Sequence, residues 1–207
     1  EVFKNLWFDT IYHEHLDYHT VKPLKLFFEK LNMNLFHVEK KDIQGGSIRN
    51  YVQLVDSHNK IESSVDKLIL EESLDGLHNL NKLKIFQSRI EEVKKELKET
   101  LGLLKKKKKS IVAYGAPTKS TTLLNFFEID STYIDYIVDD NPLKQDKFSP
   151  LLHIPIKSSK TLFSNEHPDY LIILAWNFAD SIIEKIRKNE NFSGKYIIPL
   201  PKVIIKN

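Results

Sequence analysis

Hydrophobic positions change their spacing twice along the chain, and these changes divide the 207 residues into three stretches. The first stretch, residues 1–58, has apolar residues at helical spacing over 24–31, directly after a proline that suits a helix start. Two strand-like runs follow at 34–39 and 47–55, separated by a Gly-Gly pair at 45–46, so we expect them to pair antiparallel. The first stretch is therefore predicted to be a small α+β segment.

The second stretch, residues 59–109, has the pattern of a long amphipathic helix. Apolar residues recur in steps of three and four from Leu77 to Leu104, and the pattern extends upstream to Ile61 with Gly76 as the expected break. Packing against the rest of the fold is the favoured role of such a helix. A two-chain coiled coil is the alternative, which leaves the oligomeric state open, with a dimer as one outcome.

The third stretch, residues 110–207, alternates apolar strand-like runs with helical patterns. The expected strands lie at 111–114, 133–138, 170–175 and 196–201, a short extended piece lies at 154–156, and the expected helices lie at 119–127 and 179–187. Strands separated by helices of this length form parallel βαβ units with right-handed crossovers. We therefore expect an α/β fold with a Rossmann-like parallel sheet and flanking helices, preceded by the small α+β segment and the long amphipathic helix.

The composition excludes several classes of function. The chain has no cysteine, which removes disulfides, thiolate metal sites and cysteine nucleophiles. Five of the basic residues behind the net charge of +3 form the single run Lys105–Lys109, so the basic character is local and we expect no nucleic-acid partner. The sequence has neither a bilayer-length apolar run nor a leader-like start, so we expect no membrane association and a cytoplasmic location.

Glycine and polar residues follow three of the expected strands, at the edge where open α/β sheets bind their ligands. Gly115 allows a tight turn into a helix whose N-terminus carries Lys119, and a helix N-terminus favours an anion such as phosphate. Asn141 follows the second strand, and Trp176 and Asn177 follow the third. The chain contains no Gly-x-Gly-x-x-Gly, so the standard dinucleotide fingerprint is missing, and an ordinary helix cap is the competing interpretation of the first loop.

The densest group of reactive side chains lies near the start of the chain, where Tyr12, His13, Glu14 and His15 are consecutive and His19 follows. A histidine beside a phenol and a carboxylate suits a general base near neutral pH, because the unperturbed imidazole pKa is about 6.5. A surface or capping role is the competing interpretation. A metal site built from these histidines is a further alternative, but a spacing such as His-Glu-x-x-His is missing, and we predict no metal site.

Six motifs occur in an order that makes the chain recognisable. They are Phe-Asp-Thr-Ile-Tyr-His-Glu-His-Leu-x-Tyr at 8–18, Gly-Gly-Ser-Ile-Arg at 45–49, Tyr-Gly-Ala-Pro-Thr-Lys-Ser at 114–120, Asp-Asp-Asn-Pro-Leu-Lys-Gln at 139–145, His-Ile-Pro-Ile at 153–156 and Leu-Ala-Trp-Asn-Phe-Ala at 174–179. In this order the chain closely resembles the C-terminal part of the nucleotide-sugar C-methyltransferases, which methylate thymidine-diphosphate keto-deoxysugars. The resemblance extends over almost the whole chain.

The resemblance implies roles for particular residues. In the family's Tyr-x-Glu-His motif the histidine is the base that removes the proton next to the 4-keto group, which gives that role to His15, with Tyr12 and Glu14 as its neighbours. The resulting enolate attacks the methyl group of S-adenosylmethionine. In the family, S-adenosylmethionine and a structural zinc are bound by parts of the enzyme that precede this region, so we expect no cofactor in these 207 residues and a fragment that is inactive alone.

The substrate contacts come from loop position alone. We expect Gly115, Lys119, Asn141, Trp176 and Asn177 to bind the nucleotide sugar, because they follow the strands of the sheet.

The chain also departs from the family pattern. The family often has glycine at the positions of Ser120 and Asp146, which leaves the identity of the sugar open. A non-catalytic nucleotide-binding module and a dimerisation domain remain as alternative functions.

Overall fold

The structure, a computed structural model, describes residues 1–43, 46–164, 167–188 and 192–207. The chain divides into two compact units, one formed by Glu1 and Leu16–Gln87 and the other by Val2–His15 and Ser88–Asn207. Gly45, in the expected Gly-Gly pair, lies outside the described residues. Whether 1–58, 59–109 and 110–207 act as separate functional parts stays a prediction.

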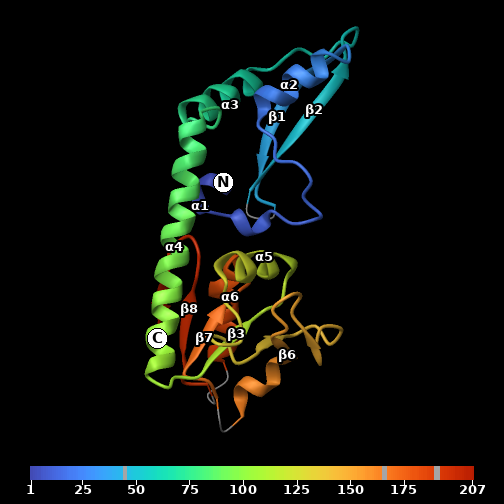
Figure 1. Cartoon of the computed structure of the whole chain (residues 1–207). Coiled ribbons are helices and arrows are strands. Elements are labelled where there is room, and N and C mark those ends of the chain that lie inside the picture. The colour runs from blue at the N-terminus through green and yellow to red at the C-terminus, as the bar shows by residue number, and fades with distance from the viewer. Residues whose placement is uncertain (44–45, 165–166, 189–191) are drawn as a thin grey trace. The chain divides into compact units, whose positions relative to one another are not determined.

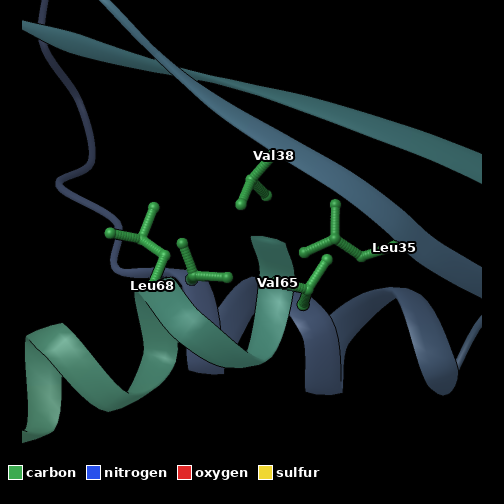
Figure 2. Close-up of a cluster of buried hydrophobic side chains, with 5 residues drawn as sticks. Leu35, Val38, Val65 and Leu68 are labelled. Atoms are coloured by element: carbon green, nitrogen blue, oxygen red, sulfur yellow. The ribbon is translucent and has the colours of Figure 1, made fainter. Parts of the chain in front are cut away.

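The first unit packs two helices against a strand pair. It contains α2 (Val21–Glu29), β1 (Met33–Lys41), β2 (Ser47–Leu54) and α3 (Ser63–Leu74). The antiparallel pairing of β1 with β2 is confirmed. Figure 2 shows Leu35 and Val38 of β1 facing Val65 and Leu68 of α3, and these side chains form the buried core of the unit together with Val21.

A carboxylate from α3 satisfies the start of α2. The Val21 N–H donates to both carboxylate oxygens of Glu72, at 2.9 and 3.1 Å. The preceding residue, Thr20, makes no side-chain capping bond, so Glu72 supplies the acceptor that the helix end needs. This contact stabilises a helix start at Val21, three residues before the expected one. A bond from a residue 51 positions away leaves no local sequence signal, so the earlier start was not predicted.

The long helix predicted in the second stretch is confirmed as α4 (Leu80–Lys106), with α3 upstream and the chain turning at Gly76, whose φ is +71°. Its buried residues lie on one face: Ile90, Val93, Leu97, Leu101 and Leu104. Lysines on α4 pair with the segment that follows α5 (Thr118–Phe127): Lys94 and Lys98 both contact Glu128, and Lys105 contacts Asp135 at 2.6 Å. The lysine run is therefore in part an ion-paired helix end.

The second unit contains a seven-stranded sheet in the order β5-β6-β4-β3-β7-β8-β9. The strands are β3 (Ile111–Tyr114), β4 (Ile137–Asp139), β5 (Lys147–Phe148), β6 (Pro155–Ser158), β7 (Tyr170–Ile173), β8 (Lys195–Ile198) and β9 (Ile204–Lys206). The five central strands are parallel, and β5 and β9 add antiparallel edges.

The Rossmann-like α/β prediction is confirmed by this sheet and its helices, which include α5 and α6 (Ala179–Arg187). Figure 1 shows β3, β7 and β8 as neighbouring arrows. The remaining short helices are α1 (Val2–Asn5), η1 (Phe8–Thr10), η2 (Ser159–Phe163) and η3 (Trp176–Phe178). None of the helices formed by the described residues combines the length and the apolar character that a membrane span requires.

Two details of the sheet differ from the sequence expectation. The strand expected at 133–138 begins only at Ile137, because the N–H groups of Tyr133 and Ile134 donate to the Asp130 carbonyl in a turn. The strand expected at 196–201 ends at Ile198, and the chain then reverses and returns as β9.

Candidate active site

The ligand edge of the sheet lies where the strand order reverses. From β3 the chain passes to β4 on one side, whereas β7 and then β8 continue on the other side. In such sheets the crevice at the carboxyl ends of the strands flanking this point is the usual ligand site. The loops after β3, β4 and β7 carry the five residues that were expected to bind substrate.

A pocket of about 320 Å³ opens at these strand ends. Its lining includes Tyr114, Gly115, Pro117, Asp139, Asp140, Lys144, Ala175, Phe178, Ser181, Ile182 and Lys185. Gly115 has a φ of +90°, and a Cβ at this position would lie 3.2 Å from the Cβ of Ala175. Glycine is therefore required for both the turn and the close approach of the two loops.

Asp140 is the centre of a hydrogen-bond network in this pocket. Its carboxylate accepts from the Tyr114 hydroxyl at 2.5 Å, from Ser159 Oγ at 2.6 Å and from Lys185 Nζ at 2.7 Å. Burial acts to raise the pKa of Asp140, but the hydrogen bonds from Lys185, Ser159 and Tyr114 outweigh it, so the pKa lies below its usual value. Burial and the neighbouring carboxylate raise the pKa of Tyr114 to about 12, which keeps its hydroxyl a donor.

The carboxylate of Asp139, at the end of β4, accepts hydrogen bonds from the backbone of the β3–α5 loop and of the turn after β4. Oδ2 accepts from the Ala116 N–H at 2.7 Å, and Oδ1 accepts from the Asn141 N–H at 2.8 Å. Pro117, the next residue in the loop, has no N–H to offer. The loop therefore lacks two of the amide donors that a glycine-rich phosphate loop would supply.

Three of the expected substrate residues lie together beside this loop. The Lys119 ammonium lies 4.3 Å from the Trp176 ring centroid, a cation–π geometry, and donates a hydrogen bond to Asn177 Oδ1. Burial lowers the pKa of Lys119, and the negative charge of Asp9 opposes this shift. We call Lys119, Trp176 and Asn177 the lysine cluster.

Asn141 is the expected substrate residue that stands apart from the lysine cluster. Its side-chain oxygen accepts from the Leu143 N–H at 3.0 Å, so it closes a local turn after β4. The side chain is exposed, and the residues that line the pocket do not include it.

Asp9, to which the sequence analysis gave no role, connects the lysine cluster to the start of the chain. Its carboxylate is fully buried, and Oδ2 accepts the Trp176 indole N–H at 2.7 Å. Burial raises the pKa of Asp9 to about 6, although the Trp176 hydrogen bond and the Lys119 charge both act to lower it. Nothing in the neighbouring sequence marks this burial, because the hydrogen-bond partner lies 167 positions away.

The proposed catalytic residues lie directly after Asp9. The rings of Tyr12 and His15 stack with centroids 4.6 Å apart, and the His15 N–H donates to the Tyr12 carbonyl at 2.8 Å. Both side chains are half-buried. Glu14 is exposed and lies 3.9 Å from Nε2 of the exposed His13, so the structure brings Tyr12 and His15 together and turns Glu14 toward solvent.

Within the described ranges, no three histidine, aspartate or glutamate side chains gather in a way that could hold a metal ion.

Comparison with known proteins identifies the family to which the chain is similar. A family model for the C-methyltransferase C-terminal domain matches residues 42–201, which include strands β3 to β8 of the sheet and the residues that line its pocket. The chain is also similar to the C-methyltransferase NovU of Streptomyces niveus, with 31% identity over 202 residues that cover 98% of this chain and 48% of NovU. The chain thus spans about half the length of this relative.

Proposed function

Because the chain belongs to the C-methyltransferase C-terminal domain family, we propose that it is the substrate-binding and base-supplying part of an S-adenosylmethionine-dependent methyltransferase acting on a nucleotide-linked keto-sugar. One observation carries this proposal. The Tyr12–His15 pair and the lysine cluster lie in the same compact unit and are linked through the hydrogen bond between Asp9 and Trp176.

His15 is the general base of the proposed reaction. Its imidazole takes a proton from the sugar carbon next to the ketone, and the electron pair of the broken C–H bond forms the enolate. Tyr12, stacked on His15, donates a hydrogen bond from its phenol O–H to the enolate oxygen as negative charge develops there. Glu14, whose carboxylate is open to solvent, accepts a hydrogen bond from the bound sugar.

The nucleotide sugar is held by the loops at the carboxyl edge of the sheet. Lys119 supplies positive charge for the diphosphate, and Trp176 and Asn177 fix the position of Lys119. Gly115 keeps the β3–α5 loop close to the β7–α6 loop, and the part of Asn141 is to shape the turn after β4. Lys144 and Lys185 line the neighbouring pocket, which Lys119 does not, and they pair there with Asp139 and Asp140.

The described residues do not fit S-adenosylmethionine at this sheet. The acidic residue at the end of the second strand, Asp139, already accepts two backbone N–H groups, and the β3–α5 loop lacks the glycine-rich turn of a cofactor site. We therefore propose no role for the described residues in binding the methyl donor or the family's zinc, and we derive no step of donor chemistry for this chain.

Calorimetric titration with thymidine diphosphate tests the binding part of the proposal. We expect saturable heat with the 207-residue chain, and we expect Lys119→Met to weaken binding at least about tenfold, since one charged hydrogen bond contributes 1.5–3 kcal/mol. Lys98→Met is the control, because Lys98 pairs with Glu128 away from the pocket. Absence of saturable heat up to about 1 mM ligand would contradict nucleotide binding.

A further inference from the structure

The segment that carries Tyr12, Glu14 and His15 is anchored on α5 by an aromatic contact and a long hydrogen bond. The Phe8 ring stacks on Phe127 with centroids 5.1 Å apart, and Thr122 Oγ1 donates to the Ile11 carbonyl at 3.4 Å. These contacts hold the segment to one side of the ligand edge. The connection to the loop after β7, where Trp176 and Asn177 lie, is a separate one, and there the Trp7 ring packs against Trp176 with centroids 5.8 Å apart.

Asp9 adds a hydrogen bond to that second connection, at a cost in stability. Its side chain is fully buried, one carboxylate oxygen binds Trp176, and the other, Oδ1, has no hydrogen-bond partner among the described residues. A buried carboxylate with an unsatisfied oxygen destabilises a fold, and a neutral residue of similar size would fill the same space at a lower cost. A buried side chain that lowers stability in this way is typical of a position retained for function.

We propose that Asp9 is a positioning residue that fixes the Tyr12–His15 pair relative to the lysine cluster by binding Trp176. Asp9 would then act through His15 and would not touch the substrate. This inference rests on the proposed function, because it assigns His15 as the group that must be held in place. It extends that function by naming the contact that sets the distance between base and substrate loops.

The charge of Asp9 strengthens this contact. On the segment that carries Asp9, the neighbouring side chain is the uncharged Trp7, whose ring lies 5.8 Å from that of Trp176 between centroids. From α5, the Lys119 ammonium supplies the positive charge that acts on Asp9, and from the β7–α6 loop the partner is the neutral Trp176 indole. Ionised Asp9 makes a charge-assisted hydrogen bond that protonation converts into a weaker neutral one. The positioning contact is therefore stronger above pH 6 than below it.

Fluorescence tests the contact without any substrate. Trp7 and Trp176 are the two tryptophans of the sequence, so Trp7→Phe leaves Trp176 as the single emitter. We expect its emission to titrate with a midpoint near pH 6, and Asp9→Asn in the same background to remove the transition. Glu72→Gln is the matched control, because Glu72 is a buried carboxylate with a raised pKa in the other unit. A transition that survives Asp9→Asn would overturn the assignment to Asp9.

A double-mutant cycle tests positioning itself. The His15 imidazole resonance, identified by its loss in His15→Gln, is followed by NMR in Asp9→Leu, Trp176→Phe and the double variant. Both single variants should shift this resonance, the double variant should add little to either, and His153 should not move. An unmoved His15 resonance in Trp176→Phe, whose ring still packs, would contradict the proposal.

Kinetics in the whole methyltransferase completes the test. Asp9→Asn should lower kcat at least tenfold and leave KM for the nucleotide sugar within twofold, because positioning of the base acts on the chemical step. A loss confined to KM would contradict the positioning role. The fluorescence and NMR measurements need no sugar, so their failure is distinguishable from failure of the proposed function.

Discussion

The Trp176 indole donates a 2.7 Å hydrogen bond to the buried carboxylate of Asp9, a residue 167 positions away in the sequence. This bond joins the segment with the proposed base to the loop with the proposed substrate residues. Its acceptor is also a group whose charge is costly to bury, because burial raises the pKa of Asp9 to about 6. This one hydrogen bond therefore affects the position of the segment, the stability of the fold and the proposed chemistry.

The raised pKa of Asp9 predicts a specific pH dependence of stability. The folded carboxyl holds its proton up to about pH 6, whereas the unfolded carboxyl loses it near 3.8, so the free energy of unfolding falls as the pH rises between these values. Asp9→Asn should remove this loss, which makes the variant equal to the wild type near pH 3, below both values, and more stable at pH 7, by up to about 3 kcal/mol. Urea unfolding at several pH values measures the difference. A constant difference across the range would contradict the assignment.

Loss of Glu72 should destabilise the first unit. Glu72→Ala leaves the buried Val21 N–H without its acceptor, and we expect a loss of about 1–3 kcal/mol in the free energy of unfolding. Glu71→Ala is the matched control, since Glu71 pairs with Lys40 at the surface and its loss should change stability less than the loss of Glu72 does. Chemical unfolding followed by circular dichroism compares the two variants, and equal losses would show that the Val21 contact has no special weight.

Gly115→Ala should disturb the ligand edge. The φ of +90° disfavours any side chain, and the added Cβ would press on Ala175, so we expect a loss of about 1–3 kcal/mol and weaker nucleotide binding. Gly102→Ala in α4 provides a contrast, because its new Cβ meets nothing closer than 4.0 Å and alanine favours helices by about 1 kcal/mol. Thermal unfolding of both variants gives the comparison. Unchanged stability in Gly115→Ala would contradict the close approach of the two loops.

The sequence predicted the elements that have strong periodicity. The long helix α4, the β1–β2 pair and the parallel strands β3 and β7 were confirmed, because each has a run of apolar residues at its own spacing. The edge strands β5 and β9 were not predicted, since two or three residues at a sheet edge produce no periodic pattern. The fold class was therefore accessible from the sequence, whereas the width of the sheet was not.

The candidate site was predicted in part for the same reason. Parallel strands place their loops at one edge, and this rule predicts that Lys119 and Trp176 lie close together, as their cation–π contact shows they do. The buried contacts of Asp9 and Glu72 were not predicted, because their partners lie far away in the sequence and nothing near them marks a buried carboxylate. The roles of the site residues themselves stay predictions.

Hydrogen–deuterium exchange at the sugar carbon next to the ketone is the most direct test of the central claim. It is measured by NMR in D₂O with the whole methyltransferase and a thymidine-diphosphate keto-sugar, without methyl transfer. We predict that wild-type protein catalyses the exchange, that His15→Asn slows it at least about 100-fold, and that His13→Asn, a change at an exposed neighbour, leaves it near the wild-type rate. Exchange by His15→Asn at the wild-type rate would contradict the assignment of His15 as the base.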